Sequence, residues 1–155
     1  MNPLLDRLTL AFALAGGALL CALVLAVTAS ILGRWLFDTP LLGDVELMQL
    51  GCAVAIAAAL PYCQWHGGHV MVNVFTQRAK PHTQRTLDRA GALAAAAIYL
   101  LLAWRAGVAV ADLRASGETT MLLAIPLWWA YVALVPGLLL AAANALYAVV
   151  SGPPQ

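Results

Sequence analysis

Charged residues are scarce in this sequence of 155 residues: only 10% are Asp, Glu, Lys or Arg, whereas 63% are hydrophobic. An ordinary soluble domain carries about 25% charged residues, so a soluble globule is excluded because it could not cover its own core. Disorder is excluded as well, because disordered chains combine low hydrophobicity with high net charge. The net charge of +1 is too small to predict binding to nucleic acid. The composition indicates an integral membrane protein.

Cysteine is equally scarce, with three residues in the chain. Cys21 and Cys52 lie inside hydrophobic runs, and Cys63 lies near the end of one. A membrane enzyme that oxidises thiols needs paired cysteines on the outer side of the membrane. The positions of these three cysteines do not fit that class.

One short cluster, Cys63, His66 and His69, has a spacing that could suggest a metal site. Gly67 and Gly68 are expected to end the helix between these side chains, and a complete ligand set is not evident. Haem ligation would need histidines inside the spans, and the histidines lie outside them. We therefore expect interfacial polar residues here and no metal or other cofactor, although a redox or metal enzyme stays an open alternative.

Catalytic motifs are missing from the sequence. It contains no glycine-rich phosphate loop, no nucleophile elbow and no pair of carboxylates inside a hydrophobic run. Inverted repeats of the kind that build substrate sites in transporters are not evident either. We expect a protein that is not an enzyme, either a membrane accessory subunit or a very small transporter.

Long hydrophobic runs are what the sequence has instead. A helix needs about 20 apolar residues to cross a bilayer, and four runs are long enough. The predicted spans are about residues 8–33, 46–65, 89–111 and 124–149. The first run is too long for a secretion signal and no convincing cleavage site follows it. We expect an all-α integral membrane protein, a four-helix bundle that forms one membrane domain over residues 1–155.

The connections between these runs differ in basic residues. Only Arg34 lies between the first two runs, whereas the connection between the second and third contains Arg78, Lys80, Arg85 and Arg89. Basic connections stay in the cytoplasm, so both termini are expected to be cytoplasmic.

The same basic connection contains an apolar pattern, formed by Val70, Met71, Val74 and Phe75. This pattern predicts an amphipathic segment at the membrane surface, with nearby basic side chains directed toward lipid phosphates. Membrane lipids are therefore expected partners.

Three ionisable residues lie close to the predicted bilayer. Arg34 ends the first run and Glu46 begins the second, so an ion pair between them is a candidate contact on the outer side. Arg105 lies late in the third run. Its side chain either extends to the interface or contacts a partner subunit, because a charge inside the bilayer is costly.

Residues near the start of the last run also have predicted structural roles. Pro126 is expected to open the last helix, because proline suits a first turn. Trp128 and Trp129 are expected to anchor that helix at the interface or to contact a partner. Pro61 and Pro136 are expected to bend their helices.

Small residues recur at helical spacing, which allows helices to approach closely in lipid. The neighbouring helix could belong to this chain or to another. The sets are Ala13 with Gly17, then Gly51, Ala55 and Ala59, then Ala103, Gly107 and Ala111.

Three segments taken together resemble a known family. Residues 34–37 (RWLF) precede 43–47 (GDVEL), residues 59–64 (ALPYCQ) lead into 67–73 (GGHVMVN), and residues 116–120 (SGETT) precede 125–131 (IPLWWAY). In order and spacing they resemble the small membrane subunit, of the DctQ type, of tripartite ATP-independent periplasmic (TRAP) transporters. Asn73 departs from this pattern, because members often carry an acidic residue there, and Glu46 lacks the second acidic or aromatic neighbour that members often have.

The resemblance implies a role in transport across the bacterial inner membrane. The small subunit would be a multi-pass scaffold for a large permease subunit that holds the substrate and sodium sites. A periplasmic binding protein would deliver an organic acid, and an ion gradient would drive its uptake. Within this interpretation Gly67, Gly68 and His69 are candidates for the turn that leads into the cytoplasmic segment.

A small homodimeric multidrug-type transporter is the alternative. That family also has four helices, but it needs a carboxylate inside its first span. Residues 8–33 contain no such residue.

Overall fold

The computed structural model describes residues 3–37, 43–66 and 81–151 of the chain. These residues form four helices: α1 (Pro3–Phe37), α2 (Asp44–Trp65), α3 (Pro81–Ser116) and α4 (Trp128–Ser151). Each is long and apolar enough to cross a membrane. The prediction of an all-α membrane protein with four spanning helices is confirmed. The predicted turn at Gly67, Gly68 and His69 and the amphipathic segment lie outside the described residues.

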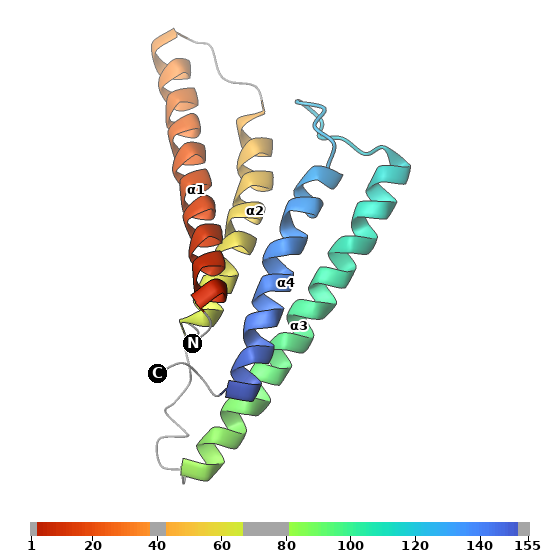
Figure 1. Cartoon of the computed structure of the whole chain (residues 1–155). Coiled ribbons are helices and arrows are strands. Elements are labelled where there is room, and N and C mark those ends of the chain that lie inside the picture. The colour runs from red at the N-terminus through yellow and green to blue at the C-terminus, as the bar shows by residue number, and fades with distance from the viewer. Residues whose placement is uncertain (1–2, 38–42, 67–80, 152–155) are drawn as a thin grey trace.

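The four helices form a layer in the order α1, α2, α4, α3 (Figure 1). Within the described residues, α1 packs on α2, α2 on α4 and α4 on α3, whereas the backbone of α3 approaches neither α1 nor α2 and α1 barely reaches α4. The expected four-helix bundle therefore takes the form of an open layer. Its physical reason is that lipid tails are as apolar as leucine, so closing a bundle buries no hydrophobic surface from water.

The contact between α1 and α2 depends on glycine at two points. A Cβ added to Gly16 would lie 2.8 Å from the carbonyl oxygen of Ala55, so the two backbones approach closely there. The side chain of Leu23 packs against Gly51, and its Cδ1 lies 2.5 Å from the position that a Cβ at residue 51 would occupy. Gly17, which the small-residue spacing had indicated, has open space around it. The close approach therefore uses the neighbouring glycine.

The contact between α2 and α4 is built around two prolines. Pro61 lies inside α2 and has no N–H to donate, so the carbonyl of Ala57 loses its usual partner in the helix. Gly137, directly after Pro136 in α4, lies against that same carbonyl, and a Cβ there would collide with it. Glycine is therefore required for α4 to approach α2 at this point.

Small residues of α3 face α4. Ala103 and Ala106 are buried with Leu138 of α4, and partly buried apolar residues surround them. Of the predicted set Ala103, Gly107 and Ala111, only Ala103 packs within the described chain, and Gly107 and Ala111 are exposed. Two of the four helices are also longer than the predicted spans, since α1 and α3 continue beyond their apolar runs.

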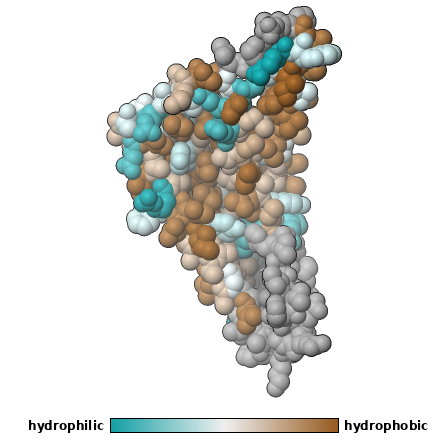
Figure 2. Space-filling model, turned by 180° about the vertical axis from the view of Figure 1, so that it is seen from behind, coloured by the Kyte–Doolittle hydropathy of each residue, from teal (hydrophilic) through white to brown (hydrophobic). Residues whose placement is uncertain are grey.

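The surface of the layer is mostly apolar. Figure 2 shows hydrophobic side chains across the middle of one broad face, with hydrophilic residues toward its upper end and along its left edge. Exposed apolar residues are distributed along α1 and α3, such as Leu25 and Leu101. This distribution suits a lipid environment, in which apolar surface needs no cover from water.

Candidate functional site at the hairpin end

Several polar contacts between elements lie at one end of the layer. At this end, which we call the hairpin end, α1 and α3 finish and α2 and α4 begin (Figure 1). Two acidic side chains at this end, Asp44 and Glu46, lie in the first turn of α2. We take this cluster as the candidate functional site.

Glu46 ties α2 to the connection between α3 and α4. Its Oε1 accepts the backbone N–H of Leu122 at 2.8 Å, and its Oε2 accepts the backbone N–H of Leu123 at 3.1 Å. Both carboxylate oxygens are therefore occupied by adjacent backbone donors. Hydrogen bonds to an ionised acceptor are stronger than neutral ones, so this contact fixes the position of the connection relative to α2.

The connection itself, residues 117–127, has an ordered hairpin-like shape. The N–H of Thr120 donates to the carbonyl of Ile125 at 2.9 Å, and the N–H of Leu127 donates to that of Glu118 at 3.2 Å. The Thr120 hydroxyl also accepts the N–H of Ile125 at 3.1 Å. Ala124 takes a positive φ of 51° at the tip, which is uncommon for a residue with a side chain.

Asp44 joins α1 to α2 in a similar way. Its Oδ2 accepts the hydroxyl of Ser30 at 2.9 Å, and its Oδ1 accepts the N–H of Val45 at 2.8 Å. Ser30 is buried. A carboxylate in the first turn also complements the positive end of the helix dipole, so Asp44 stabilises both the start of α2 and its contact with α1.

Gly43 allows the connection to sit close to α2. Its φ of +85° lies in the left-handed region that favours glycine. Its Cα also lies against the side chain of Leu123, so a Cβ at this position would collide with that leucine. The Glu46 contact and the Gly43 contact thus act on neighbouring parts of the same connection.

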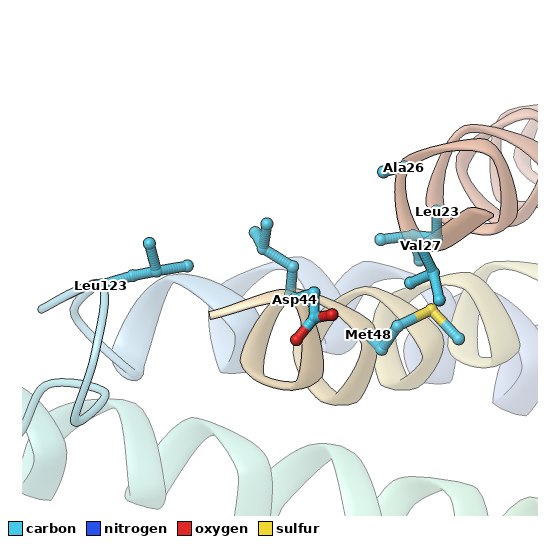
Figure 3. A pocket seen from close by; sticks show the side chains of 7 residues that line it. Leu23, Ala26, Val27, Asp44, Met48 and Leu123 are labelled. Atoms are coloured by element: carbon cyan, nitrogen blue, oxygen red, sulfur yellow. The ribbon is translucent and has the colours of Figure 1, made fainter. Parts of the chain in front are cut away.

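A recess of about 240 Å³ opens beside this cluster. Figure 3 shows side chains from α1, α2 and the connection around it, with Asp44 between them. The lining residues are Leu23, Ala26, Val27, Asp44, Leu47, Met48 and Leu123. Its lining is apolar apart from Asp44, whose carboxylate already has two donors.

The predicted pair between Arg34 and Glu46 is not formed. Arg34 is exposed at the end of α1, and the oxygens of Glu46 accept backbone donors from the connection. The prediction paired two side chains of opposite charge. The carboxylate instead accepts hydrogen bonds from two adjacent backbone N–H groups, which residue types in the sequence do not indicate.

Pro126 lies ahead of α4, which begins at Trp128. It pairs with Thr119 in an isolated bridge of the connection, and its carbonyl accepts the N–H of Trp129 at 3.2 Å. The expectation that Pro126 opens the helix is therefore wrong, because α4 begins two residues later, at Trp128. The proline instead belongs to the hairpin-like connection, where its missing N–H costs no helical hydrogen bond.

The two tryptophans lie at the start of α4. The Trp128 ring lies 5.0 Å from the guanidinium carbon of Arg114, at the end of α3, and 5.7 Å from the Trp129 ring. Trp128 thus links α3 and α4 through a cation–π contact, while Trp129 is 61% exposed.

The cysteine and histidine cluster is only partly described. Cys63 and His66 are exposed near the end of α2, and the His66 ring stacks on Tyr62 at 4.1 Å. His69 lies outside the described residues. Over residues 3–37, 43–66 and 81–151, no group of three metal-ligating side chains occurs.

One buried polar residue was missed by the sequence analysis. Asn144 of α4 is 2% exposed, and its Nδ2 donates to the carbonyl of Pro61 at 3.0 Å. Its Oδ1 and the Nε1 of Trp65 are buried without a hydrogen-bond partner. An asparagine inside a hydrophobic run was the available signal, because polar residues within a span usually have a partner.

The contacts at the hairpin end suit a positioning role. Both carboxylates accept hydrogen bonds from donors that are fixed by the fold, namely the buried Ser30 hydroxyl for Asp44 and two backbone N–H groups for Glu46. Such an arrangement orients a loop and a neighbouring helix against the start of α2.

Comparison with known protein families assigns the chain to one of them. Residues 23–152 match the family described as "Tripartite ATP-independent periplasmic transporters, DctQ component". A search of curated proteins gave no match. The match includes the second part of α1 and all of α2, α3, α4 and the connection between α3 and α4. The chain therefore belongs to the DctQ family and is the small permease component of a TRAP transporter.

Proposed function

We propose that this chain is the bracing subunit of a TRAP transporter in the bacterial inner membrane. It would assemble with a large permease subunit that carries the substrate path, while a periplasmic binding protein delivers an organic acid. Uptake would be driven by an ion gradient, of sodium in our proposal. Family membership over residues 23–152 supports the transport role.

The layer of helices is the observation that carries this proposal. Because α1 and α3 form its two edges, each has a large surface that no other helix of the described chain covers. A layer with two broad apolar faces can lie along a larger membrane protein over its full height. The carboxylates of Asp44 and Glu46 hold this layer and its connection in shape, which suits a brace.

The orientation is part of the proposal. Basic residues such as Arg78, Lys80 and Arg85 in the connection between α2 and α3 favour a cytoplasmic position for both termini. The hairpin end would then face the periplasm, where the binding protein delivers its substrate. A fluorescent protein fused after Gln155 should fluoresce in the cytoplasm, whereas a periplasmic alkaline phosphatase fusion there should be inactive. The opposite pattern would reverse the orientation.

Co-expression with the large permease encoded beside it tests the assembly. We expect a tag on this chain to recover the large subunit at a fixed ratio from detergent-solubilised membranes. Uptake of the organic acid into proteoliposomes should require both subunits, the binding protein and an inward sodium gradient. If the subunits never co-purify and uptake is unchanged without this chain, the proposal fails. Recovery of a homodimer that exports lipophilic cations would instead support the multidrug-type alternative.

A further inference from the structure

Arg105 lies on the surface of α3 that is turned away from α4. Ala103 and Ala106, on either side of it, are buried against α4, whereas Arg105 is exposed and its neighbour Trp104 is 70% exposed. The same surface carries exposed apolar side chains up to about three turns away. We call this set the far face of α3, formed by Ala94, Ile98, Leu101, Trp104, Arg105 and Val108.

The depth of Arg105 follows from its position along the helix. Arg114 lies over the ring of Trp128, at the start of α4, so both residues mark the hairpin end of the spans. Arg105 precedes Arg114 by nine residues, which is about 14 Å along a helix that rises 1.5 Å per residue. The hydrocarbon layer is about 30 Å thick. The Cα of Arg105 therefore lies well inside that layer.

The Arg105 side chain is too short to bring its charge to either membrane surface. Side chains on a helix lean toward its N-terminus, which for α3 is the direction away from Arg114 and from the nearer surface. Toward the other end, the next basic residue is Arg89, sixteen residues or about 24 Å away. Both distances exceed the reach of an arginine side chain.

No partner for the guanidinium occurs inside the described chain. Asp112 lies on the same side of α3, but two turns away, and neither a hydrogen bond nor an ion pair joins Arg105 to any described residue. A guanidinium has five N–H donors and is always charged. Leaving them unpaired in hydrocarbon is costly, and charged residues in spans usually pair with another group.

We propose that the far face of α3 is an interface with a transmembrane helix of a partner subunit, and that this helix presents a carboxylate to Arg105. The inference rests on the proposed function, in which that partner is the large permease. A carboxylate matches the planar guanidinium in charge and shape. Trp104 beside it adds a large apolar contact, and tryptophan and arginine are the residues that most often carry interface energy.

The substitution Arg105→Leu distinguishes a protein interface from a lipid-facing surface. The full chain and its large subunit are co-expressed, and the recovered large subunit is compared for wild type, Arg105→Leu and Arg105→Lys. Arg89→Leu is the matched control, because it removes an exposed arginine from the same helix near its other end. We expect Arg105→Leu to lower recovery about tenfold or more, because the partner carboxylate is left unpaired. Arg105→Lys should keep part of the recovery, and Arg89→Leu all of it.

A photo-crosslink checks the geometry without altering the charge. Benzoylphenylalanine in place of Leu101, one turn from Arg105 on the far face, should attach to the large subunit on illumination. Equal recovery with Arg105→Leu and wild type, or no protein crosslink from position 101 in an intact complex, would overturn this inference alone. Failure of the wild-type chain to recover the large subunit would overturn the proposed function as well, so the two failures are distinguishable.

Discussion

Two regions of the layer hold helices together by different means. At the hairpin end, Asp44 and Glu46 reach across to other elements and accept hydrogen bonds from Ser30 and from two backbone N–H groups. Where α2 meets α4, the contact depends instead on the close approach of Gly137 to a carbonyl, beside one buried asparagine. Hydrogen bonds position the elements at the hairpin end, whereas close packing positions α4 on α2.

This difference agrees with the energetics of membranes. Interhelical hydrogen bonds in lipid contribute on average only about 0.6 kcal/mol, because the separated helices also find partners. Close packing, in contrast, depends on the volume of the residues at the contact, and an added methyl group forces the two helices apart. We therefore expect changes of shape at the α2–α4 contact to act more strongly than changes of polarity.

Gly137→Ala should have the largest effect. The new Cβ would collide with the Ala57 carbonyl, so α4 must move away from α2 at a cost of about 1–3 kcal/mol. The measurement is the unfolding midpoint in detergent, followed by loss of the monodisperse peak after heating. Gly107→Ala is the control, because Gly107 is also helical but has open space around it, and its midpoint should not fall. Equal midpoints for the two variants would contradict a shape-dependent contact.

Gly43→Ala should come next. It places a side chain in the left-handed region, which costs about 1–2 kcal/mol, and adds a collision with Leu123. Gly117→Ala separates these two causes, because Gly117 has a φ of +68° but open surroundings. The unfolding midpoint should fall for both variants and further for Gly43→Ala. If the unfolding midpoint of Gly117→Ala falls as far as that of Gly43→Ala, the collision with Leu123 does not contribute.

Glu46→Gln should loosen the connection more than it lowers the unfolding midpoint. Glutamine keeps one acceptor oxygen, but its NH₂ group would face the second backbone N–H, so one of the two hydrogen bonds is lost. Limited chymotrypsin cleavage after residues 121–123 should become faster. Glu118→Gln changes a glutamate in the same connection and should leave the rate unchanged. Unchanged cleavage in Glu46→Gln would show that Glu46 does not hold the connection.

The helices themselves were predictable because length and hydropathy are local properties of the sequence. Each predicted span lies within or close to a helix, and Trp65 ends α2 at the predicted residue. The order of the helices in the layer was not predictable, because it depends on which surfaces fit. Gly16 and Gly17 are adjacent and chemically identical, and only the packing of α1 on α2 decides which one meets Ala55.

The candidate site was predictable only in part. Glu46 was identified because an acidic residue at the edge of a span is costly without a partner. Its actual partners, the N–H groups of Leu122 and Leu123, belong to the backbone and carry no sequence signal. The prediction therefore paired Glu46 with Arg34, the nearest opposite charge in the sequence.

Asn144→Ala should have the smallest effect of the four. It removes one hydrogen bond to the Pro61 carbonyl, worth about 0.6 kcal/mol in lipid, and it also removes the buried Oδ1 that has no partner. The unfolding midpoint should fall slightly, and Thr28→Ala, which loses a bond within its own helix, serves as reference. If Asn144→Ala lowered the midpoint as much as Gly137→Ala, polarity would hold α2 to α4 as it holds the hairpin end. The two regions would then differ only in the donors that they use.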